Sequence, residues 1–521
     1  MARQTQANAD HGRYSRIKFV VFPAGCTGDG KKKNPCTVIV SGNKSALLFA
    51  VLAVFFVAAL GVAVFTEQYL LAAAPFAVLF FYTGWQHRNS VFFLLLMALP
   101  FSFEYNFSSG LGTDIPDEFL MLFVSLLFFA YWLYSPVAIK KNVLQHPLLL
   151  FLLISTCWTV VTILFSTNQQ VSVKYLLAKG WYIGAFVMAA LIIFREKQSI
   201  IKSGVVLAAS KMAVTFIILF RHYQSGFSFT TINEAVSPFF RNHVNYSAML
   251  VCLLPVLIIL FQFNTTRILR LVLAGAIVIA LVALFFSYAR GAWLALLAGI
   301  IAFWLIKKRL LFYSYIAAIV LTITLLSWIK GNDRYLRYAP DYKTTIFHKD
   351  FSEHLISTYK LKDVSTAERF YRWIAGVRMI KDNWLTGYGP NTFYANYKGY
   401  TVPAYKTWVS DNPEHSTVHN YFLLTAIEQG IPGLIFFLLL LGAMVYYAQH
   451  LYHRVQDLFY KSVVAVTGVI ITMIIVLNFL SDLVETDKIG SLFFLCLSML
   501  IVVDINTREP SNPSPDVQGI P

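Results

Sequence analysis

Long apolar runs separated by short polar stretches dominate the chain from residue 46 onward. An α-helix needs about 20 mostly apolar residues to cross the hydrocarbon core of a bilayer, and most of these runs are long enough. The pattern predicts an all-α fold, a polytopic transmembrane helical bundle of about 12–14 spans. We expect fourteen spans, near residues 46–65, 68–85, 90–103, 115–137, 147–166, 175–194, 203–221, 245–263, 267–287, 290–306, 309–329, 431–449, 461–480 and 488–504.

Three polar regions set the domain boundaries. Residues 1–45 form an N-terminal tail, and residues 505–521, rich in Pro, Ser and Asn, are expected to be a disordered C-terminal tail. Between the membrane segments 46–329 and 431–504 lies one large polar loop, residues 330–430. No cleavable signal peptide is expected, because the first apolar run is long enough to span.

The large loop contains its own helical signals. Ser365 and Glu368 form a capping box, and apolar residues then recur at helical spacing up to Ile380. The segment is predicted to be an amphipathic helix on the bilayer surface, with cations elsewhere on its surface, namely Arg369, Arg372, Arg378 and Lys381.

The end of the loop carries a second set of signals. The sequence Gly387-Tyr-Gly-Pro390 predicts a turn. Residues 418–429 are expected to form a short helix that Gly430 stops, and Pro432 suits the first turn of the next span.

Composition and charge place this bundle in a membrane with a defined sidedness. The chain is 57% hydrophobic and only 13% charged, which excludes an ordinary soluble domain. The net charge of +16 does not indicate nucleic acid, because Lys and Arg gather in alternate short loops, as the positive-inside rule requires. The rule predicts cytoplasmic termini and an outer position for residues 330–430, and the family resemblance given below would make that side the periplasm.

Cations at the predicted outer surface are the first candidate site. Arg290 is the sole charged residue between Arg270 and Lys307 in the sequence. It could bind a phosphate group bidentately or serve as a snorkelling anchor, and its outer position favours binding. Four further cations share this surface, namely Lys174, Lys179, Arg221 and Arg241. His243 and Asn245 follow Arg241 and add hydrogen-bonding groups beside it. Lys174 and Arg221 could instead simply cap their spans.

A histidine near the re-entry point is the second candidate. His419 has an unperturbed pKa near neutrality and is the best candidate for a general base. His415 lies one helical turn earlier, but the spacing fixes no acidic third ligand, so we expect no metal site and a solvated His415. Asp482, Glu485 and Asp487 are interpreted as a solvated turn rather than as partners of a histidine or arginine.

Several familiar donor-binding motifs are missing where they would work. The chain has no Walker loop, no Rossmann glycine pattern and no Asp-x-Asp nucleotide-sugar motif in a suitable place. This argues against ATP-driven transport and against a cytoplasmic nucleotide-sugar donor. A glycan donor would then be a lipid that carries its own leaving group.

Taken together, these motifs resemble the O-antigen ligase and O-antigen polymerase superfamily, and most closely O-antigen ligase. The pattern Arg-x-x-x-Leu is met by Arg290 and Leu294, and the pattern His-Asn, nine residues, Gly-x-x-Gly begins at His419. The flanking segments also resemble the family, and they run from Ser287 to Leu294 and from Trp384 to Phe393.

The resemblance implies a bacterial inner-membrane glycosyltransferase of lipopolysaccharide biosynthesis, which uses an undecaprenyl-diphosphate-linked glycan and needs no cofactor or metal. His419 and Arg290 would be catalytic, and the residues expected to bind the diphosphate or glycan are Arg241, His243, Lys174, Lys179, Arg221 and Asn420. The acceptor would be lipid A–core in a ligase, a second lipid-linked glycan in a polymerase, or a protein hydroxyl in an O-oligosaccharyltransferase. A non-catalytic transporter or flippase of such lipids is the alternative of a different class, and the clustering of ionisable groups on one side favours an enzyme.

Overall fold

The computed structural model describes residues 74–106, 112–139, 141–330, 364–401 and 417–508, with the single positions 51, 54, 57, 58 and 66. The chain divides into two compact units, Met1–Gln86 and His87–Pro521. The first unit contains α2 (Ala74–Gln86), on which the rings of Phe81 and Trp85 lie 6.5 Å apart, one turn from each other. All other elements named below belong to the second unit.

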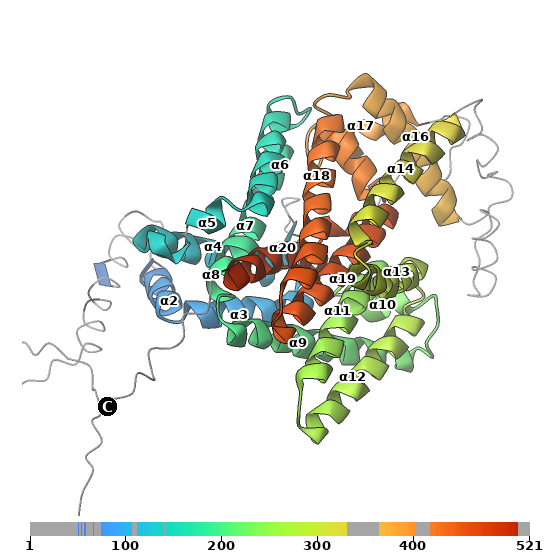
Figure 1. Cartoon of the computed structure of the whole chain (residues 1–521). Coiled ribbons are helices and arrows are strands. Elements are labelled where there is room, and N and C mark those ends of the chain that lie inside the picture. The colour runs from blue at the N-terminus through green and yellow to red at the C-terminus, as the bar shows by residue number, and fades with distance from the viewer. Residues whose placement is uncertain are drawn as a thin grey trace, which may run out of the picture. The chain divides into compact units, whose positions relative to one another are not determined.

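The second unit consists almost entirely of helices, labelled in Figure 1. Its first part contains α3 (Arg88–Ala98), η2 (Leu99–Phe101), β1 (Phe103–Asn106), β2 (Gly112–Ile115), α4 (Asp117–Tyr134), η3 (Pro136–Ala138) and α5 (Lys141–Leu144). Its middle part contains α6 (Pro147–Leu164), α7 (Gln169–Ile183), η4 (Gly184–Met188), α8 (Ala189–Ile193), α9 (Lys197–Gln224), α10 (Ile232–Val236), α11 (His243–Phe263), α12 (Arg267–Phe286), α13 (Arg290–Lys307) and α14 (Leu311–Lys330). Its last part contains α16 (Val364–Asp382), α17 (Phe393–Asn396), η7 (Tyr397–Tyr400), α18 (Tyr421–Arg454), α19 (Leu458–Leu480), η10 (Leu483–Glu485) and α20 (Asp487–Arg508).

Among the described residues, eleven helices are long and apolar enough to cross a membrane. They coincide with eleven of the expected spans, which confirms an all-α, polytopic helical bundle. The expected span at 90–103 is the shorter apolar stretch Arg88–Phe101, and the one at 68–85 overlaps the 13-residue α2. The span expected at 46–65 lies largely outside the described residues.

Small residues let the central helices approach one another closely. α18 and α19 lie side by side, and α13 packs along α19 (Figure 1). A Cβ added to Gly299 of α13 would lie 2.1 Å from Cε of Met473, and one added to Gly468 of α19 would lie 2.9 Å from Cδ1 of Ile306. Such close contact between backbones is how membrane helices gain van der Waals energy where lipid offers no hydrophobic driving force.

The degree of enclosure separates inner from outer helices. In α20, 83% of the membrane-length window is buried inside the protein, whereas the figure is 17% for α12 and 6% for α14. α12 and α14 therefore present most of their apolar side chains to the surroundings, as helices that face lipid do. α20 is a central element, and its first residues help to form the site described below.

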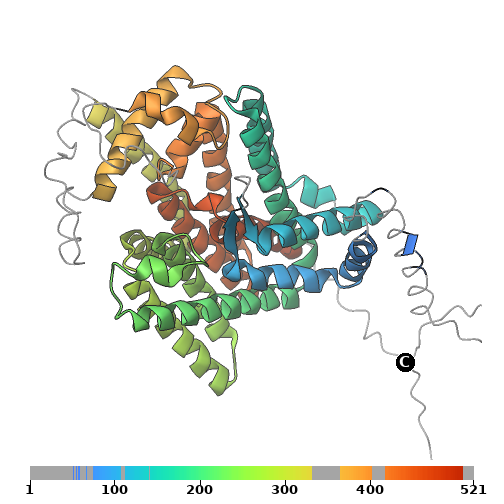
Figure 2. The same ribbon diagram turned by 180° about the vertical axis from the view of Figure 1, so that it is seen from behind.

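A short β-hairpin precedes α4 and was not expected from the sequence. β1 and β2 pair antiparallel, with Phe103 opposite Ile115 and Asn106 opposite Gly112. The hairpin is visible beside the start of α4 in Figure 2. Phe103 was expected to end the apolar span at 90–103, and most of both strands fell in the short loop before the span at 115–137. Four residues are too few for their alternation to indicate a strand.

The break in α18 agrees with the sequence prediction. Gly430 has φ 71° and ψ 177°, which divides α18 into a short first part and a long second part. Pro432 then lies in the first turn of the second part, where its missing N–H costs nothing. The amide of Ile431 donates instead to the carbonyl of Trp384, which ties the break to the preceding loop.

Replacing Gly430 by Ala is expected to lower the free energy of unfolding by about 3 kcal/mol, because its backbone conformation belongs almost solely to glycine. A Cβ there would also lie 2.1 Å from the carbonyl oxygen of Leu385. Thermal unfolding of the purified protein measures the effect. Gly399→Ala is the matched control, since a Cβ at Gly399 meets nothing within 4 Å. Equal melting temperatures for the two variants would refute this account of the break.

A charged cluster closes the bundle at the end of α18 that is remote from His419. The carboxylate of Asp504, 0% exposed, accepts hydrogen bonds from Arg454 and Arg508 and lies 3.0 Å from Nε2 of His146. Hydrogen bonds of this charged kind are stronger than neutral ones. The cluster links α6, α18 and α20.

Asp504→Asn is expected to lower the free energy of unfolding by about 2 kcal/mol, because two arginines lose their shared carboxylate. Asp457→Asn should change stability by less than about 1 kcal/mol, since the Asp457–Lys197 pair is half exposed and Asn still caps α19. Thermal melts of both variants in detergent test the difference. A loss in Asp457→Asn as large as that in Asp504→Asn would contradict the assignment.

Candidate functional site

The loop Thr417–Asn420, directly before α18, presents the histidine singled out in the sequence. His419 adopts a left-handed backbone conformation with φ 53°, and its amide donates to Oγ1 of Thr417 at 3.2 Å. The Thr417 hydroxyl in turn donates to Oδ2 of Asp482 at 2.8 Å. The loop is thereby held to the short connection between α19 and α20.

The helix α16 forms one wall of this loop. Nη1 of Arg372 donates to the carbonyl of Thr417 at 3.1 Å, and Nε1 of Trp373 donates to the carbonyl of Val418 at 3.0 Å. A Cβ added to Gly376 would lie 2.6 Å from Cδ1 of Ile427, so α16 lies tightly against the first part of α18. The backbone on either side of His419 is therefore fixed from two directions.

The surroundings of His419 keep its imidazole neutral. Burial in the first place, and then the positive charges of Arg369, Arg372 and Arg241, lower the pKa of His419 from 6.5 to about 3. At neutral pH one ring nitrogen therefore carries a lone pair, close to three guanidinium groups. A neutral base beside fixed cations can accept a proton while the cations hold an anion.

Arg241 connects this histidine with two carboxyl groups. Its charge acts on His419, on Asp482 and on Asp114 of β2. Burial raises the pKa of Asp482, and the hydrogen bond from Thr417 and the charge of Arg241 oppose that rise. Burial, together with a hydrogen bond to Asp487, raises the pKa of Asp114 to about 8, so this carboxyl group is protonated at neutral pH. Three segments distant in the sequence thus meet around Arg241.

Arg290 is the first residue of α13 and lies beside the same connection. A Cβ added to Gly291 would lie 3.2 Å from Cδ1 of Leu480, the last residue of α19. The next residue, Ser481, accepts the amide of Tyr421 at 3.0 Å, which places the start of α18 there as well. The structure therefore brings Arg290, from the start of α13, and His419, from the loop before α18, to the same end of α19.

Lys179 belongs to a polar network at the start of α18. Its ammonium lies 2.8 Å from the hydroxyl of Tyr175, 3.4 Å from that of Tyr421 and 3.9 Å from Oε1 of Glu485. The hydroxyl of Tyr175 also donates to Glu485 at 2.9 Å. Lys174 is exposed on α7, one residue before Tyr175. Their role in binding a diphosphate stays a prediction.

The remaining candidates hold the segment between α9 and α11. Arg221 donates to the carbonyls of Ser237 and Glu234, which gives it a structural task. Nδ1 of His243 lies 2.9 Å from Oδ1 of Asn233, which also accepts the His243 amide. That pairing requires a proton on Nδ1 and leaves Nε2 as an acceptor. Whether either side chain binds substrate stays a prediction.

Asn420 caps a helix in the structure. Its side-chain oxygen accepts the amide of Leu423 at 3.0 Å, and the residue is 7% exposed. This is the usual task of Asn at an N-cap, and it fixes where α18 begins. His415, the other half of the histidine pair, lies outside the described residues. Within the described ranges, no group of three or more His, Cys, Asp and Glu is arranged to hold a metal.

Residues 275–438 match the family model described as O-antigen ligase. The chain carries an O-antigen ligase family domain. Together with the eleven helices of membrane length among the described residues, the match supports a multi-pass membrane glycosyltransferase of the O-antigen ligase and polymerase type. Glycosyltransferases of this type use lipid-linked glycan donors and glycan acceptors. No curated protein matches the chain.

The O-antigen ligase domain contains Arg290, α16 and His419. It also contains the Trp384–Phe393 segment, whose turn packs against the first part of α18. The amides of Tyr388 and Gly389 donate to the carbonyls of Ile427 and Glu428, and the carboxylate of Glu428 accepts the amides of Asn391 and Phe393. A Cβ added to Gly387, which has φ 67°, would lie 2.4 Å from the carbonyl carbon of Glu428. Gly387 allows this close approach, whereas a Cβ added to Gly389 would lie 2.1 Å from Oγ of Ser166. The chain bends at Tyr388, within the turn that was expected at Gly387–Pro390.

Two interpretations of polar residues were wrong. Arg372 is not a surface cation, since it is 6% exposed and bonded to Thr417. Asp482, Glu485 and Asp487 do not form a solvated turn, because each accepts a hydrogen bond from a side chain of another segment, Thr417, Tyr175 and Tyr182 respectively. Helical spacing alone cannot identify which polar residues a second helix will cover.

Sequence reasoning also missed Arg369, Glu428 and the Asp114–Asp487 pair. The three-residue spacing of Arg369 and Arg372 places both on one helix face, and this was the one available signal that they act together. Glu428 offered a second signal, as a carboxylate about two turns into a largely apolar helix.

Proposed function

We propose that this protein transfers a glycan from undecaprenyl diphosphate to an acceptor hydroxyl on the periplasmic side of the inner membrane, most specifically to lipid A–core in lipopolysaccharide biosynthesis. The observation that carries the proposal is a neutral His419 held among three arginines. The O-antigen ligase domain supports the reaction class. The positive-inside pattern supports the sidedness.

In the proposed reaction His419 is the general base. Its unprotonated ring nitrogen takes the proton of the acceptor hydroxyl while that oxygen forms a bond to the anomeric carbon. The bond between this carbon and the diphosphate oxygen breaks, and its electron pair leaves with the diphosphate. A single displacement of this kind inverts the anomeric configuration.

The cations stabilise the departing group. Arg290 and Arg241, with Lys179 or Lys174 nearby, meet the negative charge that grows on the diphosphate. Arginine suits this task because its planar fork binds phosphate oxygens bidentately. Fixed guanidinium groups supply the stabilisation that a divalent metal supplies in other enzymes, so the proposed reaction needs no metal.

Donor binding also prepares the base. Because Arg369, Arg372 and Arg241 depress the pKa of His419, an anion bound among them offsets their charge and raises that pKa. A histidine with a higher pKa is a stronger base. The site would therefore strengthen its base as the substrate arrives.

This electrostatic arrangement predicts an unusual pH profile. Since His419 in the free enzyme titrates near pH 3, kcat/KM should stay level from about pH 8 to pH 5, whereas a histidine of ordinary pKa would halve the rate near pH 6.5. Arg372→Gln removes one depressing charge, so the pKa of His419 rises and activity is lost at higher pH than in wild type. Gln keeps a donor for the Thr417 carbonyl. If kcat/KM of the wild type fell near pH 6.5, and that of Arg372→Gln fell at the same pH, this electrostatic arrangement would be refuted.

The acceptor separates three enzymatic possibilities, ranked as ligation to lipid A–core, polymerisation onto a second lipid-linked glycan, and transfer to a protein hydroxyl. A transporter of lipid-linked glycans is the possibility of a different class. The grouping of Arg241, Arg290 and His419 at one end of the bundle favours an enzyme, because a transport path needs polar groups through the membrane.

The deciding experiment reconstitutes the purified protein with an undecaprenyl-diphosphate glycan and a chelator. Lipid A–core, additional donor and a serine-rich peptide are then offered as separate acceptors. Release of undecaprenyl diphosphate with lipid A–core alone supports ligation, and release with one of the other acceptors assigns the enzyme to that class. Folded protein that binds donor and releases none with any acceptor overturns the enzymatic proposal in favour of transport.

A further inference from the structure

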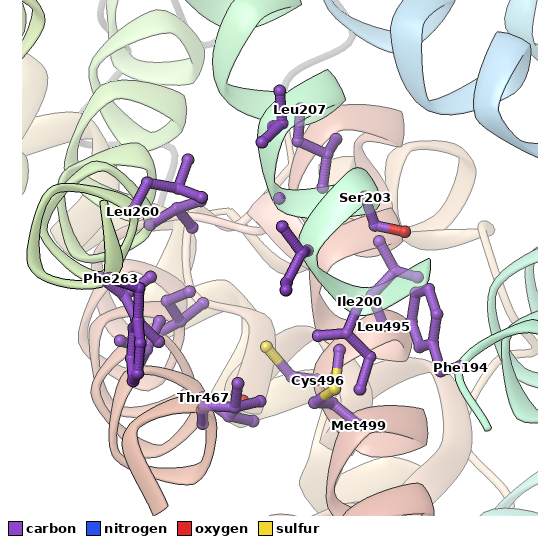
Figure 3. Close-up of a pocket in the computed structure, with 18 of the residues that line it drawn as sticks. Phe194, Ile200, Ser203, Leu207, Leu260, Phe263, Thr467, Leu495, Cys496 and Met499 are labelled. Carbon is purple, nitrogen blue, oxygen red and sulfur yellow. The ribbon is translucent and has the colours of Figure 1, made fainter. Parts of the chain in front are cut away.

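A cavity of about 250 Å³ lies between α9, α11, α19 and α20 (Figure 3). Its lining is apolar apart from Ser203, Asn264 and Thr467. On α19 the lining residues run from Phe459 to Ile470, in the first half of the helix, whereas the candidate active site lies at the last residue, Leu480. With a rise of about 1.5 Å per residue, ten residues separate the two by roughly 15 Å or more. The cavity is therefore distinct from the glycosyl-transfer site.

Glycine makes room for this cavity. Gly204 lines it, and a Cβ there would lie 3.9 Å from both Val256 and Leu260, the facing residues on α11. A larger side chain at Gly204 would extend toward Val256 and Leu260, which also line the cavity. Apolar cavities of this kind exclude water and accept apolar molecules, and about 150 Å³ already holds a benzene ring. The lining thus suits a hydrocarbon chain.

A buried lysine lies one helical turn beyond the cavity. Ile200, Gly204 and Leu207 line it from one face of α9, and Lys211 continues that face. Lys211 is 3% exposed, at the middle of a membrane-length helix. The titratable side chains near its ammonium are Cys252 and Cys496, and Cys496 also lines the cavity.

Lys211 has no acidic partner in the described part of the chain, and no side chain or carbonyl there accepts a hydrogen bond from its ammonium. An ionisable side chain at this depth is costly unless an anion accompanies it. A carboxylate brings one negative charge to one ammonium, whereas a lipid phosphomonoester, with a charge of about −1.5 to −2, would leave excess charge in the membrane interior. The chemistry therefore favours a carboxylate head group with a single hydrocarbon chain.

We propose that this cavity binds a long-chain fatty acid, with its carboxylate on Lys211 and its chain along the apolar lining toward Phe263 and Phe459. This site is independent of the glycosyl-transfer reaction and of the identity of its acceptor.

The test uses hexadecanoic acid with a photoreactive diazirine in its chain, and the methyl ester of the same compound. Cross-linked peptides of the full-length protein in detergent are identified by mass spectrometry. We expect the acid to label cavity residues of α9, α11 and α20 at least tenfold more than the ester. Equal labelling by acid and ester in the wild type would overturn the proposal.

Two variants distinguish the contribution of the cavity to labelling from that of Lys211. Lys211→Met should reduce labelling by the acid to the level of the ester, and Gly204→Leu should reduce labelling by both probes. Gly275→Leu is the matched control on α12, because a Cβ there meets nothing within 4 Å. It should leave labelling unchanged. Undiminished labelling by the acid in either Lys211→Met or Gly204→Leu overturns the assignment.

Ligand-induced stabilisation gives a second readout that does not depend on cross-linking. Unmodified hexadecanoic acid should raise the melting temperature of the wild type and of Gly275→Leu, and should not raise that of Lys211→Met. Should Lys211→Met fail to fold, Gly204→Leu takes its place in this comparison, and hexadecanoic acid should not raise its melting temperature. An equal rise in Gly204→Leu and in the wild type would contradict binding in the cavity.

Discussion

Replacing His419 by Ala lowers kcat for glycan transfer by about 10²–10⁴-fold, the usual contribution of a general base. The physical reason is that no other neutral imidazole is held by Thr417 and Asp482 among the arginines of the described site. Donor binding should persist, because in the proposed reaction the arginines and not the histidine bind the diphosphate. The measurement is the rate of undecaprenyl diphosphate release by reconstituted enzyme, beside a donor-binding assay.

His450→Ala is the control for this experiment. His450 lies on the same helix, α18, toward its other end, and its ring stacks on Tyr446 with centroids 5.7 Å apart. Its removal should leave kcat within about twofold of wild type, the range expected for a residue that takes no part in proton transfer. A His419→Ala enzyme that transfers glycan at the wild-type rate would remove the base from the mechanism.

Arg290→Ala is expected to lower kcat by about 10²–10³-fold, since it deletes a preorganised cation from the place where leaving-group charge develops. Arg290→Lys should recover only part of the rate, because an ammonium keeps the charge but cannot form two parallel hydrogen bonds. The loss should fall mainly on kcat, since charge on the diphosphate oxygen is greatest in the transition state. Steady-state kinetics with varied donor concentration separate kcat from KM.

Arg270→Ala provides the matched control for the arginine. Arg270 is exposed at the start of α12 and stacks over the ring of Phe261 at 4.9 Å. It lies at the opposite end of α12 from the residues that precede Arg290. Its loss should leave kcat near that of wild type. If Arg290→Ala raised KM alone and spared kcat, Arg290 would act in binding and not in stabilising the leaving group.

Local features of the chain were predictable from the sequence. Hydropathy located eleven helices of membrane length, because each spans the bilayer by its own residues and needs no partner to be recognised. The break at Gly430 followed from glycine and proline chemistry, and the turn at Gly387–Pro390 from the same kind of signal. In each of these cases the determining residues are neighbours in the sequence.

Contacts between distant segments could not be read in this way. Arg372 donates to Thr417 and Glu428 accepts from Asn391, and neither pair has a spacing that indicates contact. Helical periodicity showed that α16 has two faces, but it could not show that α18 covers the face carrying Arg372. The electrostatics of His419, which depend on such long-range neighbours, therefore required the structure.

The most direct test of the proposed reaction examines which bond breaks. In a single turnover with donor labelled in both phosphates, the account predicts that undecaprenyl diphosphate leaves intact and that the anomeric configuration of the transferred sugar is inverted, as seen by NMR of the product. Both follow from attack on the anomeric carbon by a hydroxyl that His419 deprotonates. Release of undecaprenyl monophosphate, or a product with retained configuration, would contradict it.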